Sequence, residues 1–214
     1  MRRQRPVHIR SAAARHDRRP SRAVEAVILA GGLSTRMGRD KGRLRVGGRT
    51  LLAHIRAAAR GAGLRVRVLR RDAVPRCGPL GGVFTALNDA GADVLVFLSC
   101  DLPFVDPRQL VRVARNARRC GATFFVDGSG MVGFPFALRR ELLPVVAAQI
   151  QRRRLSLQEL ARATRAQRLP IPRGAAWQWS NINTPADLTT ARRLFRQRMQ
   201  TPLVSATKLV IVGA

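Results

Sequence analysis

Cysteine is scarce in this sequence: Cys77, Cys100 and Cys120 are the only three, and they lie far apart in a chain of 214 residues. The three histidines do not stand at metal-ligand spacing from them. Neither a disulfide framework nor a clustered zinc site can be read from this pattern. Cys100 directly precedes Asp101 after an apolar run. Because no base lies near Cys100 in the sequence, we interpret it as a small packed residue rather than a nucleophile.

Long apolar runs are also missing. No stretch approaches the roughly 20 apolar residues that are needed to cross a bilayer. The first residues, MRRQRPVHIRSAAARHDRRPSRA, have no apolar centre of the kind that a secretory signal contains. We therefore expect a cytoplasmic protein with no membrane partner. Hydrophobic residues still make up 46% of the chain, and its 214 residues suit one domain with a substantial core.

Acidic side chains are few, with 12 Asp and Glu against 40 Lys and Arg, so the formal net charge is +28. Such a balance is typical of proteins that bind nucleic acid. However, the basic residues are spread along the whole chain, and only Lys41 and Lys208 are lysines. Aromatic residues are not interleaved with basic ones as in single-strand binders. We predict a solvated basic surface and no specific nucleic-acid partner, with a non-catalytic nucleic-acid-binding protein as an alternative.

Strand and helix patterns alternate along the chain. Predicted strands cover residues 24–30, 64–69, 93–100 and 123–126. Predicted helices cover residues 50–62, 110–118, 139–151 and 157–164, with one more from near Gly82 and a last one from Pro185. This alternation predicts an α/β fold, a three-layer Rossmann-like single domain with a mostly parallel central sheet wrapped by helices.

The ends of the chain differ in composition from its middle. Residues 1–22 are rich in arginine and poor in apolar side chains, which predicts a basic, flexible extension. Residues 23–198 are predicted to form the domain itself. The tail, residues 199–214, ends in an apolar run that resembles the opening strand of another α/β unit. Either an extra packed strand or a truncated fusion would account for it.

The most informative stretch is VILAGGLSTRMGRDK, which ends at Lys41. Gly31 and Gly32 follow a predicted strand, and glycines there let backbone N–H groups approach a phosphate closely. Ser34, Arg36 and Lys41 add a hydroxyl, a planar fork and a point charge, which suit a triphosphate that loses its terminal pair of phosphates. The spacing is neither that of a Walker loop nor that of the dinucleotide fingerprint. We interpret the stretch as a phosphate-binding turn at the carboxyl end of a strand.

A second loop, FLSCDLPFVDP, follows the most continuous apolar run. It places Asp101 at the carboxyl edge of the predicted sheet, where a carboxylate is suited to hold Mg²⁺ bridging nucleotide phosphates. The alternative role for Asp101 is a turn or helix-capping residue. Asp106, directly before Pro107, fits that capping role better. We therefore predict that Asp101 is the metal ligand.

Four segments in order resemble the signature blocks of the molybdenum cofactor guanylyltransferases: LAGGLSTRMGRDKGRL, RRDAVPRCGPLGGVFTAL, FLSCDLPFV and NINTPADL. The resemblance covers about residues 23–195. It implies the nucleotide-diphospho-sugar transferase type of fold, shared with sugar-nucleotide pyrophosphorylases. It also implies a reaction in which GTP and Mo-molybdopterin combine, with Mg²⁺ as cofactor, to give the molybdopterin guanine dinucleotide cofactor and pyrophosphate. Molybdoenzymes or their chaperones would be the recipients of that product.

The resemblance, together with the chemistry of the two loops, assigns expected roles to single residues. Arg36, Lys41 and Asp101 would be catalytic, with Asp101 on the metal. Nucleotide contacts would come from Leu29, Ala30, Gly31, Gly32, Ser34, Lys41, Asp72 and Asp101, and contacts to the second substrate from Asn181 and Asn183.

The chain departs from the better-known members of that family at one place. They carry a longer loop with a nucleotide-contacting asparagine between the second strand and the aspartate, whereas Arg70 and Arg71 here lead almost at once to Asp72. Two related specificities therefore stay open as alternatives: cytidylyl transfer to the same pterin, and nucleotidyl transfer to a sugar phosphate.

Overall fold

The computed structural model describes residues 23–31 and 41–199. The predicted extension at residues 1–22 and all of the tail after Met199 lie outside these ranges. So do residues 32–40 of the first motif, which include three predicted site residues, Gly32, Ser34 and Arg36.

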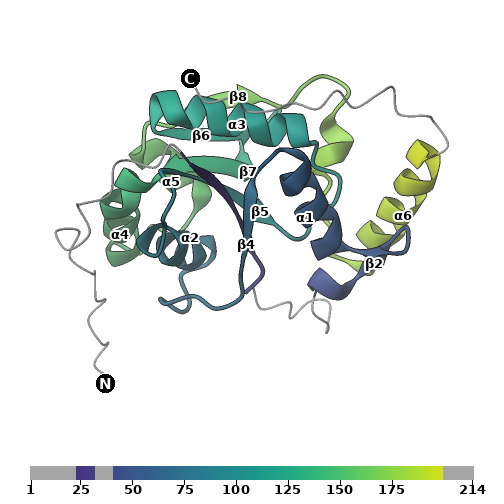
Figure 1. Cartoon of the computed structure of the whole chain (residues 1–214), viewed down its shortest axis with the longest axis horizontal. Coiled ribbons are helices and arrows are strands. Elements are labelled where there is room, and N and C mark those ends of the chain that lie inside the picture. Colours follow the sequence, from purple (N-terminus) through teal and green to yellow (C-terminus); the bar gives the residue numbers. More distant parts are fainter. Residues whose placement is uncertain (1–22, 32–40, 200–214) are drawn as a thin grey trace.

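A six-stranded sheet runs through the molecule (Figure 1). Its strands, in spatial order, are β4 (Arg65–Leu69), β1 (Val24–Leu29), β5 (Val94–Ser99), β7 (Val132–Arg139), β6 (Ala122–Val126) and β8 (Gln167–Pro170). Five strands share one direction, and β7 runs antiparallel to both of its neighbours. Two short strands, β2 (Arg45–Val46) and β3 (Arg49–Thr50), form a separate hairpin. The predicted fold class, with a mostly parallel sheet, is confirmed.

Helices cover both faces of this sheet. On one face lie α1 (Leu51–Gly61) and α3 (Pro107–Cys120), and on the other lie α2 (Pro79–Asn88), α4 (Leu143–Gln151) and α5 (Leu157–Ala163). The helix α6 (Pro185–Met199) packs against the β2–β3 hairpin instead. The described residues also form three short 3₁₀ helices: η2 (Lys41–Arg43), η3 (Arg140–Leu142) and η4 (Ala176–Trp179). None of the helices within the described ranges is both long and apolar enough to span a bilayer.

Local sequence accounts for where several helices begin. The Asp106 side chain accepts a hydrogen bond from the Arg108 backbone N–H at 2.8 Å, and Pro107 occupies the first turn of α3. Asp106 is therefore the capping residue, as the sequence predicts. Thr50 caps α1 in the same manner, through a bond from the Ala53 N–H.

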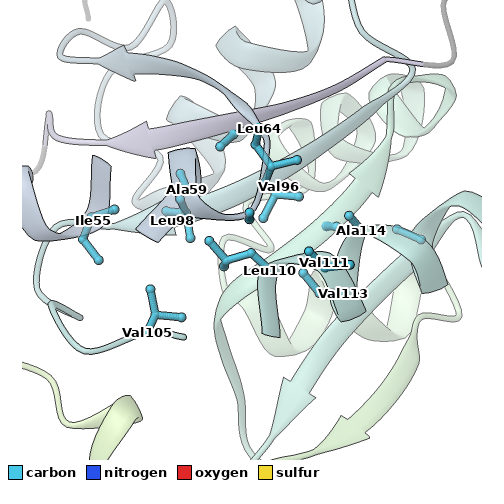
Figure 2. Packing of buried hydrophobic residues seen from close by; sticks show 14 of the residues in the cluster. Ile55, Ala59, Leu64, Val96, Leu98, Val105, Leu110, Val111, Val113 and Ala114 are labelled. Atoms are coloured by element: carbon cyan, nitrogen blue, oxygen red, sulfur yellow. The ribbon is translucent and has the colours of Figure 1, made fainter. Parts of the chain in front are cut away.

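The hydrophobic core has two halves, one on each face of the sheet. On one face, α1 and α3 pack against β1 and β5, with Ile55, Leu98 and Leu110 among the buried side chains (Figure 2). On the other face, α2, α4 and α5 enclose a second cluster that includes the stacked rings of Phe124 and Phe136. Buried on both faces, β5 is the apolar central strand that the sequence predicts.

A third, smaller cluster lies between α6 and the β2–β3 hairpin, which Figure 1 shows beside each other away from the stacked layers. It contains the buried side chains of Val46, Leu51, Ile182 and Leu188. The His54 ring lies within 2.9 Å of the Val46 carbonyl oxygen. This cluster ties the C-terminal helix to the segment that directly follows the first motif.

The antiparallel strand β7 differs from the sequence interpretation, which assigns no strand to this stretch and begins a helix at residue 139. Gly133 and Pro135 make the stretch look unlike a strand in the sequence, because glycine weakens strands and proline has no N–H to donate to a neighbouring strand. In the structure the pairing between β6 and β7 shifts between Phe124 and Phe125, so Pro135 falls in the irregular step. The helix α4 starts only at Leu143, after β7 and η3.

Candidate active site

The first motif leaves the sheet between two parallel strands. The Ala30 N–H donates to the Leu69 carbonyl at 2.8 Å, which extends the pairing of β1 with β4 by one residue. At Gly31, a Cβ atom would lie 2.8 Å from the Arg70 carbonyl oxygen. Only glycine allows this close approach of two backbones, so Gly31 is required for packing as well as suited to a phosphate.

Asp72 lies at the same edge, just past the end of β4, against the first turn of α2. A Cβ on Gly82 would lie 3.2 Å from Asp72 Oδ1 and 3.0 Å from Leu29 Cδ2. Because Gly82 has no side chain, Leu29 and Asp72, both predicted to contact the nucleotide, can pack directly against α2. Although Asp72 is exposed as a whole residue, partial burial of its carboxyl raises its pKa.

The loop that carries Asp72 is held by Thr85, a residue that the sequence analysis missed. The Thr85 hydroxyl accepts a hydrogen bond from the Ala73 N–H at 2.8 Å and donates to the Gly81 carbonyl at 2.7 Å. The residue is buried within α2. A buried hydroxyl in an otherwise apolar helix is the signal that could have identified it.

The third group at this edge is formed by Lys41, Asp101 and Asn183. Lys41 Nζ donates to Asn183 Oδ1 at 2.7 Å and lies 3.9 Å from Asp101 Oδ2. Lys41 and Asn183 are 142 residues apart in the sequence. The side chains of Lys41 and Asp101 are 18% and 19% exposed, so the pair is shielded from water but still accessible. The structure thus brings together residues from three of the four signature blocks.

Backbone contacts fix the Asn183 segment beside Asp101. The Ile182 N–H donates to the Asp101 carbonyl at 2.9 Å, and the Ile182 side chain is buried in the third cluster. Asn181, the other predicted second-substrate residue, is exposed at the start of this segment. Asp187, which the sequence analysis did not select, accepts bonds from the N–H groups of Asn183 and Thr184.

One more carboxylate follows a strand at this edge, but it is committed to a turn. Asp127 Oδ1 accepts bonds from Ser129 Oγ, the Ser129 N–H and the Met131 N–H at 2.7 to 3.0 Å. The Ser129 hydroxyl first, and then the backbone N–H groups, lower the pKa of Asp127. These bonds commit the Oδ1 atom of Asp127 to the turn.

The donor set around Asp101 fits Mg²⁺ in the mode that uses few protein ligands. In the part of the chain that the structure describes, no three His, Cys, Asp or Glu side chains gather into a metal-binding group. Within the same ranges, Lys41 is the one cation at ion-pair distance from Asp101. A single carboxylate with substrate phosphates and waters is a common arrangement for Mg²⁺, whereas an all-protein cage is not.

Comparison with known proteins agrees with this geometry. The family model described as "MobA-like NTP transferase domain" matches residues 26–168. A molybdenum cofactor guanylyltransferase from Xanthomonas euvesicatoria is 34% identical over 175 residues, which covers 74% of this chain and 89% of that protein. A probable molybdenum cofactor guanylyltransferase from Opitutus terrae is 29% identical over 193 residues, with 80% and 96% covered.

Solved structures show the same fold. Molybdopterin-guanine dinucleotide biosynthesis protein A from Archaeoglobus fulgidus superposes with a TM-score of 0.64 at 16% identity, covering 81% of this chain and 99% of that one. A 2-C-methyl-D-erythritol 4-phosphate cytidylyltransferase from Thermus thermophilus gives a TM-score of 0.60 at 23% identity, with 81% and 99% covered. At these identities the likeness concerns the fold, while the sequence matches carry the family. The chain is therefore a nucleotidyltransferase that belongs to the molybdenum cofactor guanylyltransferase family of MobA-like NTP transferases.

Proposed function

We propose that this enzyme transfers the guanylyl group of GTP to Mo-molybdopterin, with Mg²⁺, to give the molybdopterin guanine dinucleotide cofactor and pyrophosphate. The family of its relatives supports this reaction. The observation that carries the proposal is the meeting of Lys41, Asp101 and Asn183 at the edge where β1 and β5 end. A cation, a carboxylate and an amide at one point suit a reaction between two phosphate-bearing substrates.

The proposed transfer needs no covalent intermediate with the protein. A terminal phosphate oxygen of the pterin substrate attacks the α-phosphorus of GTP in line. The new P–O bond forms as the bond to the pyrophosphate oxygen breaks, and the electron pair leaves with pyrophosphate. Catalysis then consists of positioning the two substrates and neutralising their charge.

Each predicted residue has a part in that scheme. Lys41 and Arg36 bind the departing phosphates, and each such contact contributes on the order of 2 to 4 kcal/mol to lowering the barrier. Asp101 would hold Mg²⁺, and the bound ion would offset the charge repulsion between the phosphates of the two substrates. Asn181 and Asn183 bind the second substrate. The remaining predicted nucleotide contacts are Leu29, Ala30, Gly31, Gly32, Ser34 and Asp72.

The identity of the base is tested by a competition between nucleotides. Purified protein with Mg²⁺ and Mo-molybdopterin is given GTP or CTP, and pyrophosphate release and the dinucleotide product are measured. We expect turnover with GTP and at least tenfold less with CTP. Preference for CTP would instead indicate cytidylyl transfer, in line with the altered loop at Arg70 and Arg71. Turnover with a sugar 1-phosphate in place of the pterin would indicate a sugar-nucleotide enzyme.

A further inference from the structure

Asn183 contacts Lys41 through its side chain and Asp187 through its backbone. The Asn183 side-chain oxygen accepts the bond from Lys41 Nζ at 2.7 Å. The backbone N–H groups of Asn183 and Thr184 both donate to Asp187 Oδ2, at 2.9 and 2.8 Å. In return, the Asp187 N–H donates to Thr184 Oγ1 at 3.2 Å. Asp187 therefore closes a reciprocal cap at the start of α6, and Asn183 is part of that cap.

Charge links Asp187 to Lys41 as well. The N–H of Asn183, the hydroxyl and N–H of Thr184 and the charge of Lys41 all lower the pKa of the Asp187 carboxyl, in that order of size. Lys41 thus lies near two carboxylates. Its Nζ is 3.9 Å from Asp101 Oδ2, and it binds the side chain of Asn183, whose backbone N–H binds Asp187. The negative charges of both carboxylates stabilise the Lys41 ammonium at this position, between the loop after β5 and the start of α6.

We propose that Asp187 is a positioning residue of the transferase site: by capping α6 through Asn183 and Thr184, it orients the Asn183 amide that holds Lys41 beside Asp101. This inference rests on the proposed function, in which Lys41 binds the phosphates of GTP. Asp187 itself touches neither substrate. It acts through Asn183, so removing the Asp187 side chain should reduce GTP binding and turnover only to the extent that they depend on Lys41.

The chain contains a matched control for the capping itself. At the start of α5, Ser156 and Glu159 form the same reciprocal cap, with Glu159 N–H to Ser156 Oγ at 3.2 Å and Ser156 N–H to Glu159 Oε2 at 3.3 Å. That helix packs against α4 and β7, on the face opposite α1 and α3. Loss of either cap should lower the melting temperature by a similar few degrees, because a cap contributes similarly at either helix.

The experiment compares Asp187→Ala, Asp187→Asn and Glu159→Ala in melting temperature, kcat and KM for GTP. We expect Glu159→Ala to keep wild-type kcat/KM and Asp187→Ala to lose about tenfold, a change within the range seen for coupled neighbours. Asp187→Asn should recover most of that loss, because its amide oxygen still accepts from the two N–H groups. Equal kcat/KM in Asp187→Ala and Glu159→Ala would overturn the proposal, as would full loss in Asp187→Asn.

A second measurement tests the route through Lys41. Equilibrium binding of GTP with Mg²⁺ is measured for wild type, Lys41→Ala, Asp187→Ala and the double variant. We expect each single variant to weaken binding and the double variant to bind no worse than Lys41→Ala. If the losses of GTP affinity in the two single variants add up in the double variant, the positioning role of Asp187 is wrong, while the role of Lys41 stands. Unchanged binding in Lys41→Ala would overturn the phosphate-binding role of Lys41, and with it this inference.

Discussion

Lys41 is one of two lysines in a chain with 40 basic residues, and its ammonium lies where the first motif, the β5 loop and α6 meet. An ammonium is a compact point charge, whereas the guanidinium that predominates elsewhere in this chain is a broad planar fork. At a junction with the Asn183 amide and the Asp101 carboxylate, the smaller group fits both partners at once. Lys41 is therefore the side chain for which substitution is most informative.

We predict that Lys41→Ala loses more than 90% of turnover with its fold intact, because the departing phosphates lose their charge partner. A tenfold loss corresponds to about 1.4 kcal/mol. Steady-state pyrophosphate release measures the change, and the melting temperature shows whether the fold persists. Activity above about a tenth of wild type would show that Lys41 does not serve the leaving group.

For Asp101→Asn, we expect magnesium-dependent transfer to collapse while stability changes by less than about 1 kcal/mol, the usual range for a partly exposed group. The variant keeps the size of the side chain, and the backbone bond from Ile182 to the Asp101 carbonyl is unaffected. A titration of activity with Mg²⁺ at fixed GTP is the measurement. Normal magnesium dependence would make Asp101 a structural residue, and the ligand would then be sought at Asp72 or at Asp127, of which only Oδ1 is committed to its turn.

Asp72 should make the stability of the protein depend on pH. Its folded-state pKa is raised above the usual 3.8 by burial. The contribution of protonated Asp72 to the free energy of unfolding is therefore complete below pH 3.8, and it is lost as the pH rises through the folded-state pKa. We expect Asp72→Asn to melt higher than wild type at pH 7 and to lose this advantage near pH 3, while binding GTP more weakly. A lower melting temperature at pH 7 would contradict the expectation.

Among the elements, the start of α2 shows most clearly how packing shapes the site. A Cβ on Gly81 would lie 2.6 Å from the Val74 carbonyl oxygen and 3.0 Å from Asp72 Oδ2. The loop after β4 can therefore close on the helix only where side chains are absent. The glycine pair of the GPLGG block is required by this contact, in addition to any contact with nucleotide.

The variant Gly81→Ala should consequently destabilise the protein by about 1 to 3 kcal/mol, because the loop carbonyl cannot move away cheaply. Helix propensity alone would favour alanine by about 1 kcal/mol. Urea unfolding of this variant is compared with Gly91→Ala, where a Cβ would meet nothing within 4 Å. If both variants are equally stable, the close approach at Gly81 does not constrain the loop.

The main elements of the fold could be predicted because their patterns are local. Periodicity and capping locate α1, α3 and α6, and a continuous apolar run locates β5. The strand β7 could not be found this way, because Pro135 reads as a strand breaker until the irregular pairing with β6 is known. The short strands β2, β3 and β8 have two to four residues each, too few for a pattern to develop.

The candidate site was predictable in part for the same reason. Glycines and charged residues after strands point to the carboxyl edge, so Gly31, Asp72 and Asp101 could be selected from the sequence. The pairing of Lys41 with Asn183 spans 142 residues and follows no period, so only the fold reveals it. Thr85 and Asp187 act on backbone groups of their neighbours, a role that residue type alone does not specify.

For the whole molecule, the formal charge of +28 predicts an attraction to polyanions that salt should abolish. Binding that rests on phosphate contacts alone loses several decades of affinity as salt rises to about 200 mM. We therefore expect any binding to duplex DNA at low salt to vanish at that concentration, while GTP with Mg²⁺ still raises the melting temperature. Tight DNA binding at about 200 mM salt would favour the nucleic-acid-binding alternative.

Among the strands of the described ranges, β4 and β8 form the two borders of the sheet. Arg65 is exposed on one and Arg168 on the other, and β8 ends at Pro170. If a strand from another copy of the chain paired with either border, it would bring further arginines close to Arg65 or Arg168. At Pro170 it would also find no backbone N–H to pair with. These border residues disfavour the addition of a strand from another copy of the chain, so we expect concentrated protein to remain dispersed rather than polymerise.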